Sequence, residues 1–278
     1  MPRVAVVTGA NQGLGLALVK GLCERLAEDD VVYLTARDPE KGEAAVAAIG
    51  SVRPRLRFDR LDVTEEGSVA GLAEALRQRH GGVDIVISNA AARIVRDVAP
   101  AEQVQAFVET SNHGTHRVLQ RFLPILRRAG RLVVVASSFG RLKHLPEHLH
   151  RRFEVDRLED LGAVMDGYVA AVRAGTAAAE GWPEWINVAS KVGQVAAARL
   201  AARTVAADRP ADGILVNAVC PGLVDTDASR PWFADMSKAQ SPDQAAVDVL
   251  WLATLPEGAV APAGELVQFR KVLPWRGE

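Results

Sequence analysis

The sequence predicts a single α/β domain built on a doubly wound parallel sheet of the Rossmann type. Short apolar runs alternate with longer amphipathic segments along nearly the whole chain, which is typical of repeated strand–helix units. Several runs are continuously apolar, as expected for strands that helices cover on both faces. The chain has 278 residues and lacks an internal repeat or linker. We therefore expect one domain over residues 1–278.

Gly, Pro, Asn and Asp residues delimit the expected elements. The strand candidates are 3–8, 31–35, 55–61, 83–88, 131–137, 213–219 and 265–269. The helix candidates are 14–28, 40–49, 65–79, 101–127, 188–207 and 242–254. In the last helix we expect Ser241 to be the N-cap and Pro242 the first helical residue.

Residues 141–186 break this alternation. They are rich in charge and histidine, with a helical pattern near 157–173 and a turn-prone Gly181-Trp182-Pro183. The region is too long for an ordinary connection, and such insertions are often lids or binding loops.

Composition and charge argue against several classes of protein. A hydrophobic content of 49%, a charged content of 24% and a net charge of −1 are typical of a water-soluble globular chain. No basic stripe indicates nucleic-acid binding, and no apolar stretch reaches the roughly 20 residues that span a bilayer. The N-terminus lacks the features of a signal peptide. We expect a cytoplasmic protein, with Cys23 and Cys220 reduced and buried.

The first strand candidate leads into a glycine-rich turn and then a helix. Glycines allow a tight turn and a close approach of the backbone to a pyrophosphate, and the helix N-terminus supplies N–H groups for the phosphates. The position between a strand and a helix makes this signal strong. The predicted dinucleotide-binding residues of the turn are Gly9, Asn11, Gln12, Gly13, Leu14 and Gly15.

The glycine spacing after Thr8 resembles that of the short-chain dehydrogenase/reductase family, and further motifs follow in the family's order. These are Asp62-Val63 after the third strand, Ser88-Asn89-Ala90-Ala91 ending the fourth, Ser137-Ser138 ending the fifth, Lys191 on the next long helix, and Pro221-Gly222 after the sixth. The resemblance covers essentially the whole chain. It implies a cofactor site that also includes Asp62, Val63, Asn89, Ala90, Lys191, Pro221, Gly222 and Thr226.

Three segments resemble the carbonyl-reductase branch of this family: Val6–Gly15, Leu34–Asp38 and Gly181–Pro183. So does the 141–186 insertion, which separates Ser138 from Lys191 by more residues than the family commonly has. In that branch the added helices cover the surface through which other members form tetramers. The resemblance therefore implies a monomer.

Arg37 indicates the cofactor. An acidic residue just after the second strand would bind the ribose 2′-hydroxyl of NAD, whereas a guanidinium suits the 2′-phosphate of NADPH. The branch often has a second basic residue where this chain has Gln12, so we expect this chain to bind the 2′-phosphate less tightly. The alternative is that Arg37 pairs with Asp38 or Glu40. Charge complementarity favours NADPH.

The resemblance also implies the reacting groups. In the family, a Ser and a Tyr hold the substrate carbonyl, the Tyr donates the proton, a Lys lowers the pKa of the Tyr and binds the nicotinamide ribose, and an Asn supports a water relay. Ser138 and Lys191 match the Ser and Lys, whereas Asn187 stands at the Tyr position. Ser111 stands at the Asn position, because a slip to Asn112 fits the spacing to Gly114 less well.

Asn187 changes the chemistry that this site can perform. Ketone reduction creates an alkoxide that a positioned acid protonates, typically with a rate gain of about 10²–10⁴. An amide can donate a hydrogen bond to an oxyanion but cannot give up the proton. Addition of hydride to the β-carbon of an enone needs such an acid less, because an enolate is a weaker base.

We therefore expect an NADPH-dependent reductase of a small or medium apolar carbonyl or enone, with a non-standard proton donor. The alternatives are a cyclase, isomerase or lyase that keeps the cofactor as a scaffold, and a dinucleotide-binding protein without catalysis. No metal site is expected, because the histidines do not match zinc-binding spacings. Candidate substitute acids are His113, His116, His144, His148, His150 and Tyr168. Candidates to line the pocket, or else to pack in the core, are Trp182, Trp185 and Trp232.

Overall fold

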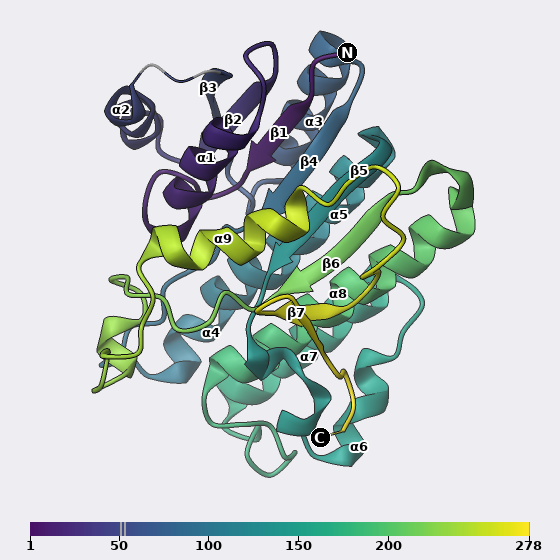
Figure 1. Cartoon of the computed structure of the whole chain (residues 1–278). Coiled ribbons are helices and arrows are strands. Elements are labelled where there is room, and N and C mark those ends of the chain that lie inside the picture. The colour runs from purple at the N-terminus through teal and green to yellow at the C-terminus, as the bar shows by residue number, and fades with distance from the viewer. Residues whose placement is uncertain (51, 53, 278) are drawn as a thin grey trace.

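A computed structural model describes residues 1–50, 52 and 54–277 and shows one sheet with helices on both faces (Figure 1). The eight strands lie in the order β3-β2-β1-β4-β5-β6-β7-β8. All neighbours from β3 to β7 are parallel, and only β8 is antiparallel to its partner. This arrangement confirms the predicted doubly wound α/β fold.

The strands are β1 (Val4–Val7), β2 (Val31–Ala36), β3 (Arg55–Arg60), β4 (Val83–Ser88), β5 (Leu126–Val135), β6 (Leu215–Val219), β7 (Leu266–Gln268) and β8 (Lys271–Leu273). The α-helices are α1 (Gly13–Arg25), α2 (Pro39–Ile49), α3 (Glu66–His80), α4 (Pro100–Val108), α5 (Gly114–Phe122), α6 (Glu147–His150), α7 (Leu158–Ala174), α8 (Ile186–Asp208) and α9 (Pro242–Ala253). Short turns of other helix types include η1 (Glu109–His113), η3 (Ser138–Gly140) and η5 (Arg151–Phe153).

Two apolar layers hold the helices to the sheet. Helices α1 and α9 cross one face together (Figure 1), where Leu22 and Leu250 are almost fully buried. Helices α3, α5 and α8 cover the other face through buried residues such as Leu76, Leu119 and Val195. Burying one such side chain stabilises the fold by about 1.5–3 kcal/mol. Both free cysteines are buried, as predicted.

Within the insertion, the helix predicted near 157–173 is α7. Its apolar stripe, which includes Leu161, Met165 and Val169, is buried in the core layer that contains α8. The insertion is also tied to the C-terminal segment, because the buried Arg141 guanidinium donates to the carbonyls of Pro274 and Gly277.

The prediction of a single helix over 101–127 is wrong in two respects. Its middle forms the π-turn η1, which joins α4 to α5, and the α-helix ends at Phe122. Pro124 explains the end, because proline lacks the backbone N–H that a helix interior needs. Strand β5 consequently begins at Leu126 rather than at residue 131.

Strand β8 was not predicted. Its hairpin turn places Phe269 and Arg270 at positive φ angles of 49° and 60°. Turns of this kind usually carry Asn or Gly, so the sequence gives no signal for this turn.

The predicted start of the last helix is confirmed. Ser241 caps α9, in a capping box with Gln244 and with Pro242 in the first turn.

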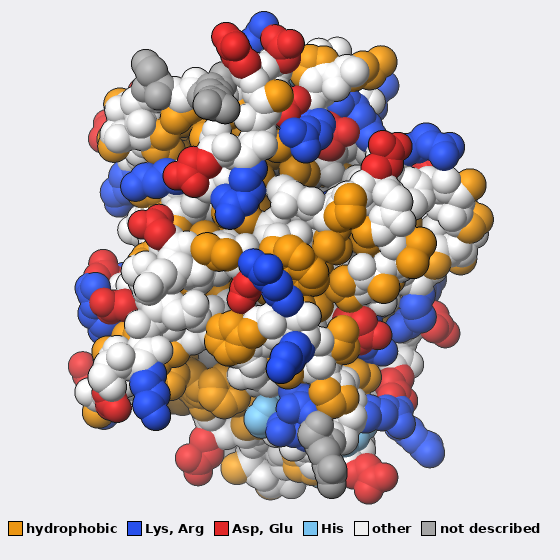
Figure 2. Space-filling model, viewed as in Figure 1, with side chains coloured by type: hydrophobic (Ala, Val, Ile, Leu, Met, Phe, Trp, Pro, Cys, Tyr) orange, Lys and Arg blue, Asp and Glu red, His pale blue; other side chains and the backbone are white. Residues whose placement is uncertain are grey.

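Charged side chains of both signs are interspersed on the face shown in Figure 2, in keeping with the net charge of −1. No helix in the described residues is both long enough and apolar enough to cross a membrane.

Candidate active site

The order of the strands brings the predicted site residues to one edge of the sheet. The sheet order reverses between β1 and β4, and in parallel sheets such a point opens a crevice at the carboxyl ends of the strands. The predicted residues that follow these strand ends are Gly9 after β1, Arg37 after β2, Asp62 after β3, Asn89 after β4, Ser138 after β5 and Pro221 after β6.

The turn after β1 has room only for glycine at its key positions. Gly9 and Gly13 have φ angles of 61° and 53°. A Cβ on Gly15 would lie 2.4 Å from the Gly9 carbonyl oxygen and 2.8 Å from the Cα of Ala10. The N-cap of α1, Gln12, makes no capping hydrogen bond through its side chain. The first N–H groups of α1 therefore have no side-chain cap.

Asn89 holds this turn in place. Its amide nitrogen donates to the carbonyls of Thr8 and Gly9 at 3.0 and 3.1 Å. In return, the Thr8 hydroxyl accepts from the backbone N–H groups of Asn89 and Ala90, both at 2.9 Å. The end of β4 thus fixes the conformation of the glycine turn.

The segment after β6 lies against the same turn. A Cβ on Gly13 would lie 3.6 Å from the Cγ2 of Thr226, and Gly222 has a φ of 84°. Arg96 reaches across to donate to the Pro231 carbonyl at 3.1 Å. The structure therefore brings Thr226 close to the glycine turn, although the two are far apart in the sequence.

Arg37 is exposed, and the pairing with Asp38 or Glu40 considered above is not observed. Asp38 instead accepts from the backbone N–H of Lys41 and forms an ion pair with its ammonium at 3.4 Å. Within the described chain no hydrogen bond or ion pair occupies the Arg37 guanidinium. This guanidinium is available to an anionic ligand.

The charge of Arg37 acts on Asp62. Burial alone would raise the pKa of Asp62, but hydrogen bonds from Thr64 and the positive charges of Arg37 and Arg60 outweigh it and lower that pKa. The Thr64 N–H and hydroxyl both donate to Asp62 Oδ1, at 3.0 and 2.8 Å. Asp62 is therefore a fixed carboxylate beside the guanidinium.

Ser138 and Lys191 come from two elements in direct contact. A Cβ on Gly140 of η3 would lie 2.7 Å from the Lys191 carbonyl oxygen, so η3 packs tightly on α8. The ammonium of Lys191 donates to Gln194 Oε1 at 2.7 Å and to the Val135 carbonyl at 3.4 Å. Burial lowers the pKa of Lys191 to about 8, against a smaller opposing effect of Cys220.

Asn187 lies in the first turn of α8, one helical turn before Lys191. Residues four apart lie on the same helix face. The Asn187 side chain is partly buried, and its amide makes no hydrogen bond with another described residue.

The π-turn η1 places Ser111 and Asn112 differently. Asn112 donates to the Ser190 carbonyl at 2.9 Å and accepts from the Ser190 hydroxyl at 2.7 Å, so its amide anchors α8. Ser111 is fully buried, and its hydroxyl has no partner in the described residues. Its carbonyl accepts from the Thr115 hydroxyl at 2.7 Å.

Aromatic side chains gather beside Ser138 and Asn187. The ring centroids of Trp185 and Trp232 lie 5.7 Å apart, and those of Phe139 and Trp185 lie 5.2 Å apart. Phe139 was not singled out from the sequence. Trp182 instead packs in the core against Tyr168, at 4.8 Å.

Five of the six candidate substitute acids are either buried or bonded to other parts of the described chain. Tyr168 is fully buried, and burial raises the pKa of its hydroxyl. Burial lowers the pKa of His116 to about 3. His113 bonds to the Asp166 carboxylate. His148 bonds to the Glu180 carbonyl, and His150 bonds to the Leu145 carbonyl. The described residues contain no group of three or more His, Cys, Asp or Glu side chains placed to hold a metal ion.

His144 is the histidine nearest to the predicted catalytic residues. Its Nε2 lies 3.1 Å from the Ser138 carbonyl and must carry a proton to donate there. Burial lowers the pKa of His144, which favours the neutral ring.

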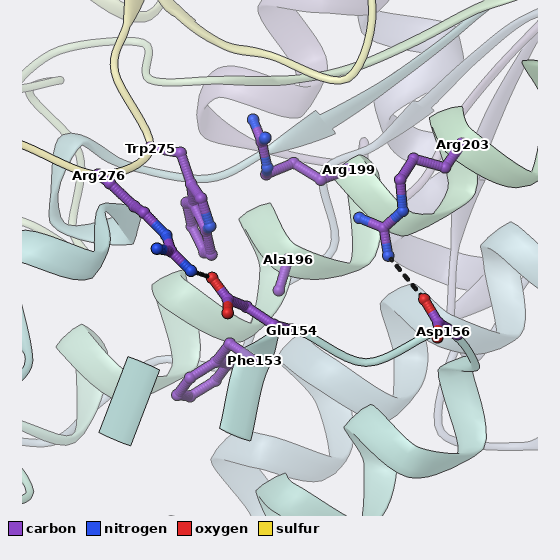
Figure 3. A pocket seen from close by; sticks show the side chains of 8 residues that line it. All are labelled: Phe153, Glu154, Asp156, Ala196, Arg199, Arg203, Trp275 and Arg276. Carbon is purple, nitrogen blue, oxygen red and sulfur yellow. Dashed lines mark ion pairs between the residues drawn. The ribbon is translucent and has the colours of Figure 1, made fainter. Parts of the chain in front are cut away.

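A separate pocket of about 480 Å³ lies on another face of α8 (Figure 3). Ala196, Arg199 and Arg203 of α8 line it at helical spacing, whereas Lys191 is not among the lining residues. Its charged groups are already paired: Arg203 with Asp156 at 3.8 Å, and Arg276 with Glu154. This pocket contains none of the predicted site residues.

Comparisons with known proteins agree with this arrangement. The family model described as short chain dehydrogenase matches residues 3–147. Carbonyl reductase 1 of Rattus norvegicus, whose name specifies NADPH, is 36% identical, covering 98% of this chain and 98% of the relative. The Homo sapiens protein of that name is also 36% identical, with the same shares covered.

The fold has a similar counterpart among solved structures. Salutaridine reductase from Papaver somniferum superposes with a TM-score of 0.79 at 24% identity, over 95% of this chain and 99% of that chain. The glycine turn is held by the end of β4, Ser138 and Lys191 lie on the packed elements η3 and α8, and the similar proteins match nearly the full length of the chain. The chain belongs to the short-chain dehydrogenase family of oxidoreductases.

Proposed function

We propose that this protein is an NADPH-dependent reductase of a small or medium apolar carbonyl or enone, with a proton donor other than the usual tyrosine. One observation carries the proposal. The unpaired amide of Asn187 stands one helical turn before Lys191, in a site that keeps Ser138 and the glycine turn. The NADPH named for the carbonyl reductase relatives supports the choice of cofactor.

The residues present fit a dinucleotide with a 2′-phosphate. Gly9 and Gly15 leave a cradle that a Cβ would fill, at the uncapped start of α1, where a pyrophosphate is favoured. Arg37 offers an unpaired guanidinium to the 2′-phosphate. Lys191 would hold the nicotinamide ribose, and the bound cofactor would supply the hydride.

The substrate oxygen would meet two hydrogen-bond donors of this chain. The Ser138 hydroxyl and the Asn187 amide can both donate to a developing oxyanion, and preorganised donors of this kind stabilise such charge strongly. Reduction of a carbonyl adds one hydride to carbon and one proton to oxygen. Asn187 cannot supply that proton, so in the site it stabilises charge without neutralising it.

This limitation favours enones over simple ketones. After hydride adds to the β-carbon of an enone, the resulting enolate is a weaker base than an alkoxide and can take its proton from water. The rings of Phe139, Trp185 and Trp232 give the site an apolar wall. We therefore propose an apolar substrate, with enones preferred.

The glycine turn should tolerate no methyl group at Gly15. In Gly15→Ala the new methyl would meet the Gly9 oxygen at 2.4 Å, so the turn must open. We expect a stability loss of about 1–3 kcal/mol and a rise in the NADPH Kd of about tenfold, equivalent to about 1.4 kcal/mol. Urea unfolding and fluorescence titration measure both.

Gly71→Ala in α3 is the matched control. A Cβ there meets nothing within 4 Å, and alanine in a helix interior is more stable than glycine by about 0.5–1 kcal/mol. NADPH binding equal to wild type in a folded Gly15→Ala protein would show that the turn does not hold the cofactor.

Arg37 should discriminate between the two nicotinamide cofactors. Arg37→Asp removes the partner of the 2′-phosphate and adds like-charge repulsion. The NADPH Kd should rise by about tenfold or more, because hydrogen bonds to charged groups contribute about 1.5–3 kcal/mol. Titration calorimetry with NADPH and NADH measures the change, and Arg151→Asp, at an exposed position on η5, is the charge-matched control. Equal affinity of the wild type for NADH and NADPH would contradict the assignment.

The insertion should keep the protein monomeric. Helix α7 buries its apolar stripe in the core of its own chain, and we propose that it thereby covers the surface used for tetramers elsewhere in the family. Light scattering should give a mass near 29.7 kDa. A mass about four times larger would refute this proposal.

Asn187→Tyr should introduce or raise the reduction of simple reactive ketones. The phenol would stand one turn from the Lys191 ammonium, which lowers the pKa of such a group. NADPH oxidation with an activated diketone and an enone measures the outcome for both proteins. Asn187→Ala, which removes the amide without adding an acid, should weaken the native reaction and gain no ketone activity.

The reductase proposal loses its main support if a folded, NADPH-binding Asn187→Tyr protein gains no ketone reduction. Product formation by the wild type without NADPH consumption would instead indicate non-redox chemistry.

A further inference from the structure

A line of three direct hydrogen bonds runs from Lys191 into the protein. The Lys191 ammonium donates to Gln194 Oε1 at 2.7 Å. The Gln194 amide nitrogen then donates to the Thr115 hydroxyl at 3.3 Å, and that hydroxyl donates to the Ser111 carbonyl at 2.7 Å. The line thus connects α8 to α5 and to the π-turn η1.

The donors and acceptors in this line have a single consistent direction. A carbonyl can only accept, so Thr115 must use its proton on Ser111 and present its oxygen to Gln194. Gln194 must then turn its NH₂ group toward Thr115 and its oxygen toward the ammonium. Chains of aligned hydrogen bonds polarise one another. The π-turn carbonyl therefore fixes the orientation of the Gln194 amide.

Burial makes this amide important to Lys191. Gln194, Thr115 and Ser111 are almost completely buried, and an ammonium in such surroundings needs acceptors in place of water. The other acceptor provided by the described residues, the Val135 carbonyl, lies at the longer distance of 3.4 Å. Gln194 is thus the main neutral acceptor for this cation.

We propose that Gln194 is a positioning residue that holds the Lys191 ammonium through the line Gln194–Thr115–Ser111. An amide neither gives nor takes a proton near neutral pH, so the line holds Lys191 and does not relay protons to it. The inference rests on the proposed function in so far as Lys191 binds the cofactor.

The titration of Lys191 gives a direct test. Its pKa is lowered by burial to about 8, and an acceptor for the ammonium opposes that lowering. The titratable group that acts on Lys191 within the described chain is the Cys220 thiol, which raises the pKa. The other groups facing the ammonium, Gln194 and the Val135 carbonyl, carry no charge.

The experiment follows the ¹³Cε signals of labelled lysines against pH in the full chain without cofactor. The chain has six lysines, and Lys191→Arg identifies the signal of Lys191. Gln194→Leu removes the acceptor, so the midpoint should fall below that of the wild type. Gln194→Glu keeps the shape and adds a negative charge, so the midpoint should rise, by about one pH unit or more.

Ser190→Ala is the matched control. It removes an equally buried hydrogen bond between α8 and η1, the one to Asn112, and leaves the acceptors of the Lys191 ammonium in place. The Lys191 midpoint should stay where it is in the wild type. Circular dichroism establishes that each variant is folded, and Gln194→Glu provides the test if Gln194→Leu does not fold.

Opposite shifts in the two Gln194 variants support the inference, since a purely structural role would not move the midpoint in two directions. An unchanged midpoint in a folded Gln194→Glu protein overturns it, as does an equal shift in Ser190→Ala. A parallel NADPH titration separates the two proposals. Opposite shifts in a chain that does not bind NADPH would remove the cofactor proposal and leave the role of Gln194 intact.

Discussion

The close approach of the glycine turn to the end of β4 is the constraint on which the rest of the site depends. A Cβ on Gly9 would lie 2.8 Å from the Cα of Ala90, and the Asn89 amide nitrogen donates to the carbonyls of Thr8 and Gly9. These contacts bring β1 and β4 together where the order of strands reverses. The site residues that follow β2, β3, β5 and β6 are placed relative to that point by the register of the parallel strands.

Much of this arrangement is visible in the sequence because its signals are local. Strand, turn and helix follow one another within Val4–Arg25, and each has its own residue pattern. The end of α5 at Phe122, which the prediction of one helix over 101–127 missed, also has a local cause in Pro124. The π-turn has no such signature.

The contacts missed from the sequence are long-range. Gln194 meets Thr115 across 79 positions in the chain, and no spacing rule connects two such residues. Phe139 follows Ser138 directly, but only the packing of η3 on α8 brings its ring to Trp185. A motif therefore predicts which residues share an edge of the sheet, whereas tertiary packing decides which side chains meet there.

Hydrogen-bond accounting distinguishes Asn187 from the other amides near the site. Buried polar groups in folded proteins are almost always paired. The Asn89 amide donates to two carbonyls, and Asn112 bonds to Ser190 through both its nitrogen and its oxygen. Gln194 bonds to Lys191 through its oxygen and to Thr115 through its nitrogen. The Asn187 amide, by contrast, is partly exposed and has no hydrogen-bond partner in the described chain. An amide that the fold itself does not use is free to bond to a ligand oxygen. We propose that Asn187, at the predicted tyrosine position, can bind an oxyanion but cannot protonate it.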